Sequence, residues 1–343
     1  MSARRSIIPV FVPHVGCPND CVFCNQRRIS GMVRPVTPEE VSCAIEQGAA
    51  ITPHGVQRQL AFYGGSFTAI PLNMQQGLLE AAQPYLKDGT ISSIRVSTRP
   101  DAINEQILLR LKDYGVETIE LGAQSMVAEV LIRAGRGHTA AQVERAARLV
   151  KEFGFELILQ MMTGLPGDED GRASITTARK IAALNPNGVR IYPTVIVRDT
   201  ALYDMWQNGM YQEHTVDAAV DVCARIVPVF EDKGIPIIRL GLNPTEDLSK
   251  GDAAGGAYHP ALGELVRSRM MLERVRALLQ EESACETIEI SVGKGKTSQM
   301  VGQKRCNIRA LEDEFGFKHI KIVETNEKSD EILVNFIAKS DEI

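Results

Sequence analysis

The sequence lacks any long uninterrupted apolar run. Its basic and then apolar start is broken by Pro9 and Pro13, so neither a secretory leader nor a membrane span is expected. It also lacks a strong charge of either sign, because 38 basic and 43 acidic residues give a formal charge of −5. A whole-chain attraction to polyanions is therefore excluded, and any contact with nucleic acid needs a local basic patch.

The composition is that of an ordinary globular protein. Hydrophobic residues make up 44% and charged residues 24% of the 343 positions, enough for one large core or two smaller ones. Seven cysteines without a paired pattern favour a reducing compartment, and we expect a cytoplasmic protein. Four of the seven are scattered singly and are interpreted as structural: Cys43, Cys223, Cys285 and Cys306.

The other three cysteines, Cys17, Cys21 and Cys24, stand close together in a CxxxCxxC pattern. Thiolates at this spacing can ligate three corners of a 4Fe-4S cluster, and no fourth cysteine is near. One iron would then be open to a ligand that is not protein. Phe23, directly before the last cysteine, either shields a cluster as an apolar wall or simply anchors the loop.

The cysteine spacing leaves two other kinds of site open. Three thiolates completed by His14 or His54 could hold zinc, and two close thiols could form a redox disulfide.

Apolar, β-branched runs alternate with segments of helical period, which indicates repeated βα units. Such repeats predict an α/β fold, a partial (β/α)6 TIM-type barrel of parallel strands. The expected strands are 7–12, 60–63, 93–97, 118–121, 156–160 and 188–191, with 236–240 as a candidate seventh. The expected helices are 38–50, 73–82, 102–114, 140–153 and 171–184, and Asp101 is interpreted as the N-cap of the third.

Each of the first six strands is followed by a polar or glycine-rich motif. Because the carboxyl ends of parallel strands meet at one rim, these motifs would converge on an active-site face. They begin at Gly16, Gly64, Thr98, Gly122, Gly164 and Tyr192.

The βα rhythm stops near Pro244. We predict a barrel over 1–243, a glycine-rich linker and helix over 244–283, a small α+β domain over 284–325 with a βααβ order, and a charged, frayed tail over 326–343. The linker helix is expected at 261–279 and the two strands of the small domain at 287–292 and 319–323.

With these motifs the chain resembles the radical S-adenosylmethionine (radical SAM) superfamily, whose hallmark is the CxxxCxxC loop after the first strand. Further motifs are similar to the radical SAM domain of the elongator catalytic-subunit branch, over about residues 6–212. They are ETIELGAQS at 117–125, RGHT at 136–139, MMTGLPG at 161–167 and IYPT at 191–194. The chain has no room for that branch's acetyltransferase domain, so acetyl-CoA chemistry is not expected.

The resemblance implies a 4Fe-4S cluster, S-adenosylmethionine (SAM) at its open iron, reductive cleavage of SAM to a 5′-deoxyadenosyl radical, and an external one-electron donor such as a flavodoxin or ferredoxin. It also implies cofactor-binding roles for residues of the rim motifs, with Tyr192 and His138 as candidates to face the substrate. The implied cofactor-binding residues are Phe23, Gly64, Gly65, Thr98, Gln124, Arg136 and Leu165.

The segment 300–316 resembles a KH motif, in which a GxxG loop between two helices clamps a nucleic-acid backbone. Here the loop ends in Arg305 instead of glycine, which questions a close backbone approach. Between 294 and 321 there are seven basic residues and three acidic ones, so a basic patch is expected. The RNA-binding candidates are Lys294, Lys296, Lys304 and Arg305.

Three functions stay open at this point. A radical SAM enzyme that modifies RNA, in particular tRNA, is the first, because the resembling branch has tRNA substrates. A radical SAM enzyme acting on a small molecule or a tetrapyrrole, as coproporphyrinogen oxidases do, is the second. A noncatalytic iron–sulfur protein that binds RNA or carries electrons is the third.

Overall fold

The structure is a computed structural model of the chain and describes residues 5–12, 21–25, 34–242, 253–279, 286–327, 329 and 331–337. The chain divides into two compact units. The first comprises Met1–Thr215 and Ile226–Tyr258, and the second Val216–Arg225 and His259–Ile343. Each unit has a sheet of its own.

A parallel sheet of seven strands forms the first unit, and its spatial order β1-β2-β3-β4-β5-β6-β8 follows the chain. Because neighbouring strands are consecutive and parallel, their carboxyl ends form one rim. The strands are β1 (Arg5–Val12), β2 (Gln57–Gly64), β3 (Ser93–Thr98), β4 (Val116–Gln124), β5 (Glu156–Thr163), β6 (Gly188–Pro193) and β8 (Ile237–Leu240). The predicted partial barrel is confirmed, and the candidate seventh strand is present.

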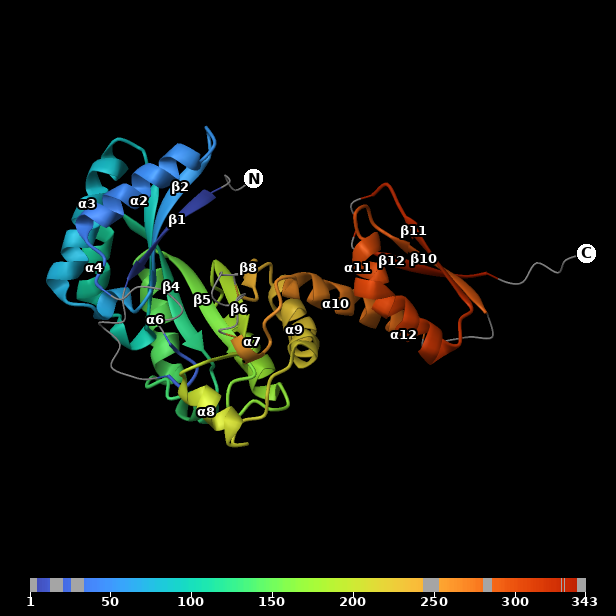
Figure 1. The fold of residues 1–343 in the computed structure, drawn as a ribbon. Coiled ribbons are helices and arrows are strands. Elements are labelled where there is room, and N and C mark those ends of the chain that lie inside the picture. The colour runs from blue at the N-terminus through green and yellow to red at the C-terminus, as the bar shows by residue number, and fades with distance from the viewer. Residues whose placement is uncertain are drawn as a thin grey trace, which may run out of the picture. The chain divides into compact units, whose positions relative to one another are not determined.

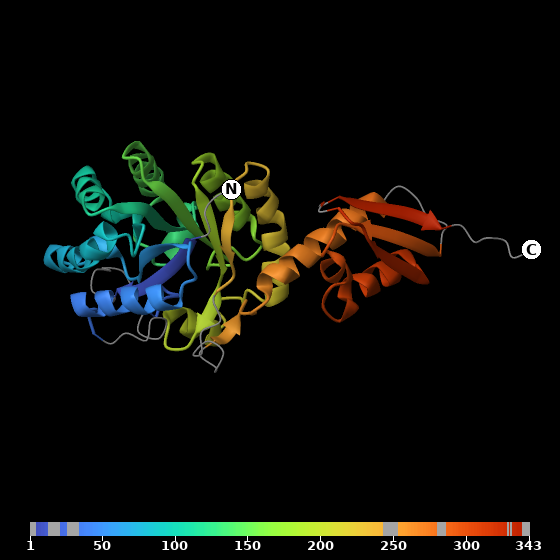
Figure 2. The same ribbon diagram turned by 90° about the horizontal axis from the view of Figure 1, so that it is seen from above.

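Helices line the outside of this curved sheet, as Figure 1 shows for α2, α3, α4 and α6 and Figure 2 shows from above. The helices of the first unit are α2 (Pro38–Ile51), α3 (Leu72–Lys87), α4 (Glu105–Asp113), α5 (Ala128–Arg133), α6 (Ala140–Glu152), α7 (Arg172–Ala183) and α8 (Ala201–Gln207). Helix α9 (Val216–Glu231) begins in the second unit and ends in the first. Two of these helices begin with a capping box, in which each of two side chains accepts a hydrogen bond from the backbone N–H of the other residue. The pairs are Thr37 with Glu40 at α2 and Thr139 with Gln142 at α6.

The Asp101 prediction is wrong. Helix α4 starts three residues later than expected, and the side chain of Asn104 accepts the backbone N–H of Ile107 as its N-cap at 2.9 Å. Asp101 lies in a 3₁₀ turn, Pro100–Ala102, and accepts two hydrogen bonds from the Arg99 guanidinium at 2.9 and 2.8 Å. The Asp101 carboxylate therefore binds the Arg99 guanidinium in a charge-assisted bidentate pair and does not cap the helix.

A small two-stranded sheet was not expected. Strand β7 (Val195–Val197) pairs antiparallel with β9 (Ala253–Gly256), so part of the glycine-rich stretch that was assigned to the linker adds a strand to the first unit. Gly256 has a φ of 87°, and a Cβ there would lie 2.7 Å from the carbonyl oxygen of Thr194. Glycine therefore permits this pairing.

The second unit contains α10 (Leu262–Leu279), β10 (Thr287–Val292), α11 (Thr297–Val301), α12 (Cys306–Phe315), β11 (His319–Glu324) and β12 (Ile332–Ile337). The order β10, α11, α12, β11 confirms the expected βααβ arrangement. Buried side chains of α10, such as Val275, share a core with Ile288 and Ile290 of β10 and Leu311 of α12. The helix placed in the linker is thus part of this unit's core.

The frayed-tail prediction is wrong over 332–337. Strand β12 pairs antiparallel with β10, which is parallel to β11 on its other side, and gives the order β11-β10-β12. Among the described residues, none of the helices combines the length and the apolar character that crossing a bilayer requires.

Candidate active site

The cysteine loop is described from Cys21 to Asn25, and Cys17 lies outside the described residues. The Cys24 amide donates to the Cys21 carbonyl at 2.9 Å, which closes a tight turn. Two backbone hydrogen bonds of Val22 fix this turn, one from its N–H to the Ala134 carbonyl at 3.1 Å and one from the Leu202 N–H to its carbonyl at 2.7 Å. The loop is therefore held by the residue after α5 and by α8.

Phe23 packs against two small apolar clusters. One consists of Val130, Ala134 and Leu165, and the other of Ile196, Leu202 and Tyr211. These contacts anchor the loop, and a cofactor-facing role of Phe23 stays a prediction. Leu165 is 1% exposed and supports the same packing.

Arg136 joins strand β4 to the cysteine loop. Its Nη2 donates to the Gly122 carbonyl at 2.8 Å and its Nη1 to the Cys21 sulfur at 3.4 Å. A Cβ on Gly122 would lie 2.7 Å from that Nη2, so glycine makes room for the guanidinium. The side chain is 8% exposed, and Nε has no partner among the described residues. A buried donor is thus available beside the loop.

Gln124 ends β4 in a left-handed backbone conformation, with a φ of 61°, next to an irregularity in the pairing with β5. Such a conformation is unfavourable for a residue with a side chain, and it occurs most at functional sites. The Gln160 amide donates to Gln124 Oε1 at 3.2 Å. The irregularity in the strand pairing therefore sets the direction of the Gln124 side chain at the rim of the sheet.

The glycine pair follows β2. Gly64 has a φ of 94°, a Cβ there would lie 2.8 Å from the Val12 carbonyl, and the Gly65 N–H donates to that same oxygen at 2.8 Å. The turn therefore needs glycine on structural grounds.

Thr98 belongs to a buried hydroxyl cluster on the neighbouring strand end. Its Oγ1 lies 2.9 Å from Ser66 Oγ and 2.5 Å from Thr68 Oγ1. Ser66 Oγ also accepts the Arg99 N–H at 3.0 Å. These bonds fix the loop after β2 to the loop after β3.

His138 is buried and neutral. Burial, followed by the charge of Arg136, lowers its pKa to about 4. Its Nε2 lies 3.2 Å from the Ala123 carbonyl and donates to it, because a carbonyl only accepts. Nδ1 is then an acceptor without a partner among the described residues.

The Gly164–Gly167 turn has braces that the sequence did not reveal. Tyr211 Oη donates to the Gly164 carbonyl at 2.6 Å, and His214 Nε2 lies 3.0 Å from Thr163 Oγ1. A Cβ on Gly164 would overlap the His214 ring. Asp168 accepts the Gly164 N–H at 3.2 Å and also contacts Ser174. The position of Asp168, between a glycine turn and a helix, could have indicated that it braces the turn. Nothing in the sequence near Tyr211 or His214 indicates such a role.

The candidate RNA-binding residues lie on the second unit. Lys304 and Arg305 are exposed, occupy the turn between α11 and α12, and have left-handed φ values of 51° and 61°. Lys294 and Lys296 precede α11. At least three of the seven basic residues pair with acidic side chains: Lys318 with Glu286 at 2.6 Å, Lys321 with Glu289 at 2.7 Å and Arg305 with Glu312 at 4.0 Å. The basic patch is therefore smaller than the sequence count suggested.

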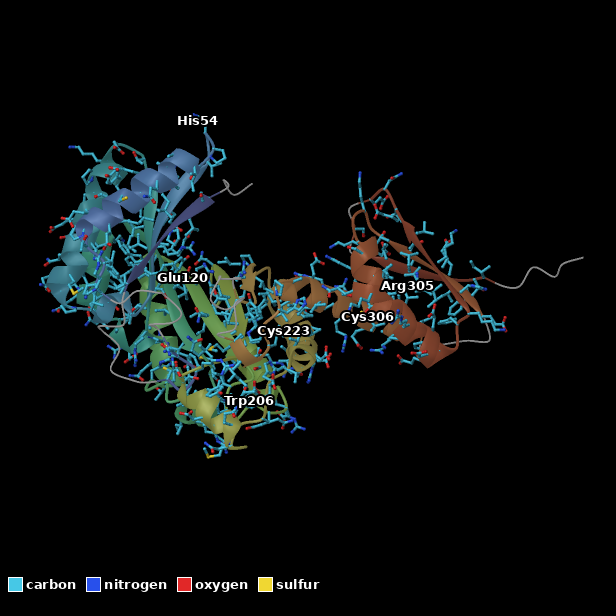
Figure 3. All side chains as sticks on the ribbon, in the orientation of Figure 1. His54, Glu120, Trp206, Cys223, Arg305 and Cys306 are labelled. Carbon is cyan, nitrogen blue, oxygen red and sulfur yellow. The ribbon has the colours of Figure 1, made fainter. Side chains whose placement is uncertain are left out.

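The residues fit a metal-bound thiolate. A guanidinium donating to a buried cysteine sulfur is the kind of outer contact that tunes iron–sulfur sites. Rim residues from β2, β3, β4 and β5 supply backbone, hydroxyl and amide groups on the same edge of the sheet, as a polar cofactor requires. Figure 3 shows the side chains around this sheet.

Comparisons with known proteins agree with this geometry. Residues 11–175 match the family model of the Radical SAM superfamily, and residues 186–271 match that of the Radical_SAM C-terminal domain. "Elongator complex protein 3" of Danio rerio is 28% identical over 237 residues, 63% of this chain and 42% of that protein. The protein of the same name from Schizosaccharomyces pombe is 35% identical over 136 residues, 39% of this chain and 25% of that protein.

The structure of the archaeal Methanocaldococcus infernus Elp3 superposes with a TM-score of 0.63 at 21% identity. The match covers 80% of this chain and 64% of that one, and it supports the fold. The chain spans less than half the length of the curated relatives named above.

Proposed function

The chain belongs to the radical SAM superfamily of enzymes, and from this premise we propose that it modifies tRNA through reductive cleavage of SAM. The observation that carries the proposal is the junction of Arg136 with Cys21 and Gly122, because it ties the cysteine loop to the strand end that also presents Gln124. The similarity to the elongator branch supports a tRNA substrate.

Three cysteines, Cys17, Cys21 and Cys24, would hold a 4Fe-4S cluster. When bound, the cluster and SAM supply a 5′-deoxyadenosyl radical that abstracts a hydrogen atom from the substrate. An external one-electron donor, such as a flavodoxin or ferredoxin, would reduce the cluster. The residues proposed to contact SAM are Phe23, Gly64, Gly65, Thr98, Gln124, Arg136 and Leu165.

The chain's own residues orient these groups and exclude water. Phe23 and Leu165 pack together beside the cysteine turn, which keeps solvent from its inner side. Burial keeps His138 neutral, so this side chain adds no positive charge beside Arg136. Gln124 offers an amide that both donates and accepts.

The second unit would bind the tRNA backbone. Its turn between α11 and α12 has the left-handed backbone of a glycine turn at Arg305, although a side chain is present. Exposed Lys304 and Arg305 then add charges to that turn, and Lys294 and Lys296 would extend the contact with phosphates.

Anaerobic reconstitution tests the function. Purified full-length chain receives iron and sulfide, is reduced, and is incubated with SAM and unfractionated tRNA, with coproporphyrinogen in a parallel sample. We expect 5′-deoxyadenosine and a mass change in tRNA nucleosides. A matched Cys24→Ala chain should lose the cluster absorbance and the 5′-deoxyadenosine together, whereas Cys43→Ala, an exposed cysteine on α2, should keep both. Turnover of coproporphyrinogen alone would contradict the tRNA proposal.

A further inference from the structure

The seven-stranded sheet has an inner face, opposite the helices in Figures 1 and 2. Polar side chains on this face are hydrogen-bonded to one another. On strands β2 to β6 every second residue points to this face, because side chains alternate along a strand. Its charged and hydrogen-bonding residues form one connected network: Gln59, Tyr63, Arg95, Thr118, Glu120, Glu156, Arg190 and Tyr192.

Glu120, labelled in Figure 3, is the centre of this network and is 3% exposed. Its Oε1 accepts from Arg95 Nη1 at 2.6 Å, from Arg190 Nη2 at 3.1 Å and from Tyr63 Oη at 3.3 Å. Two guanidiniums thus share one carboxylate. Burial, together with the charge of Glu120, raises the pKa of Tyr63 to about 12, so this phenol stays protonated.

Arg190 also fixes Tyr192 at the end of β6. Its Nη1 donates to the Tyr192 oxygen at 3.3 Å, and its Nη2 to the Tyr63 oxygen at 3.0 Å. Arginine only donates, so the Tyr192 oxygen is the acceptor and its own proton is left to point elsewhere. Among the described residues this proton has no acceptor, and the side chain is half-buried.

Aromatic surface lies beside these phenols. The Tyr63 ring faces the Arg190 guanidinium at 5.5 Å and the Phe11 ring at 6.5 Å between centroids. Phe11 pairs in register with Tyr63 across β1 and β2, which puts both on the inner face, and it is 40% exposed. The exposed Phe11 ring lies beside Tyr63, and Arg190 links Tyr63 to Tyr192. An aromatic ring and a hydroxyl donor joined in this way suit a flat polar ring.

We propose that the inner-face residues Phe11, Tyr63 and Tyr192 receive a single extruded nucleobase. Its ring packs on Phe11, and its carbonyl oxygen accepts a hydrogen bond from the Tyr192 hydroxyl. The inference rests on the proposed tRNA function and adds the residues that read the target. Enzymes that act on a base take it out of the stack, and an aromatic wall with one hydrogen-bond donor suits that base. Tyr192 is the contact residue and Arg190 its positioning residue.

The charges of this face argue against a polyanionic ring. Arg95 and Arg190 already share Glu120, and Arg5 pairs with Glu117 at 3.2 Å and Glu156 at 3.1 Å. Several carboxylates of a tetrapyrrole would meet these acidic side chains without a matching set of spare cations among the described residues. A neutral base meets no such penalty.

A deuterium-transfer experiment tests the inference. Unfractionated tRNA from cells of the same organism grown in deuterium oxide is given to the reconstituted full chain with SAM. Abstraction breaks a C–D bond of the tRNA and forms a C–D bond at the 5′ carbon, so deuterated 5′-deoxyadenosine reports the substrate directly. We expect Tyr192→Phe to lower the deuterated product roughly tenfold, the effect of losing one hydrogen bond.

The same samples provide the controls. Phe11→Leu should lower the deuterated product as Tyr192→Phe does, because it removes the aromatic ring on which the base would pack. Tyr85→Phe removes a hydroxyl that donates to Glu46 on the helical side and should have no effect. Full deuterium transfer by both inner-face variants would overturn the inference and leave the proposed function standing. Absence of transfer by the unmodified chain, or transfer only from deuterated coproporphyrinogen, would overturn both.

Discussion

At the scale of single residues, Arg136 tests whether the cysteine loop holds a cluster. We predict that Arg136→Gln lowers the reduction potential of the reconstituted cluster, because it removes both a positive charge and the donor that lies 3.4 Å from the Cys21 sulfur. A redox titration followed by electron paramagnetic resonance measures the potential.

Arg133→Gln is the matched control for this substitution. Arg133 is half-exposed and pairs with Glu129 at 2.7 Å within α5, so the same loss of charge should leave the potential unchanged. Equal shifts in the two variants would mean that only the net charge matters and that the contact with sulfur does not.

The positions of rim residues could be predicted where these residues stand in a short motif at the end of a strand. Gly64 and Gln124 end β2 and β4, two strands that the sequence located, so their place at the rim could be predicted, whereas their roles stay predictions. Tyr211 and His214 could not be predicted in this way, because they meet Gly164 and Thr163 from positions 47 and 51 residues away. Asp101 was misread because the sequence does not show that Arg99 turns back to bind it.

At the scale of elements, the chain after α8 braces the Gly164–Gly167 turn, which belongs to the proposed SAM site. We predict that Tyr211→Phe weakens SAM binding roughly tenfold without changing the cluster absorbance, because the Gly164 carbonyl loses its 2.6 Å donor and the turn after β5 loosens. Equilibrium dialysis of SAM against the reconstituted protein measures this. Tyr114→Phe, which removes an exposed hydroxyl bonded to Glu80, should keep the affinity; an equal loss there would contradict the brace.

The turn between α11 and α12 allows charge and backbone conformation to be separated. Arg305→Ala and Arg305→Gly both remove the guanidinium, but only glycine relieves the left-handed φ of 61°. We expect the glycine variant to be more stable to unfolding than the alanine variant by about 1 kcal/mol. If phosphates meet the side chain, both should weaken tRNA binding and reduce its salt slope by about 0.7 to 0.9.

Filter binding at several salt concentrations measures this slope. Lys318→Ala is the matched control, because Lys318 directly precedes β11 and pairs with Glu286 at 2.6 Å. Recovery of tRNA affinity in Arg305→Gly alone would instead indicate that the backbone approaches the RNA, as in a GxxG loop. An unchanged slope in both variants would remove Arg305 from the interface.

At the scale of the whole molecule, the barrel could be predicted because its strands and helices are consecutive and each carries its own period. The pairing of β7 with β9 and the addition of β12 could not, because their partners lie far along the chain and their sequences are short. The assignment of α10 to the second core also depends on long-range contacts, with Ile288 and Leu311, that periodicity does not report.

The stability of the first unit should fall below neutral pH because of two buried histidines. Burial lowers the pKa of His138 and His214 from 6.5 to about 4. Between these values the unfolded chain binds more protons than the folded one, so the free energy of unfolding decreases as pH falls from about 6.5 to about 4 and is independent of both groups above that window. Each histidine contributes a slope of up to about 1.4 kcal/mol per pH unit.

Trp206 on α8, labelled in Figure 3, is the single tryptophan of the chain and reports unfolding of this unit by fluorescence. Urea unfolding of the full chain at pH 7.5, 6.0 and 5.0 gives the slope. We expect His214→Gln to reduce this slope by up to about 1.4 kcal/mol per pH unit, the contribution of one proton, because the histidine that titrates is gone. His54→Gln replaces an exposed histidine and should leave the slope as it was. A slope that both variants share with the unmodified chain would show that His214 is not held neutral by its burial.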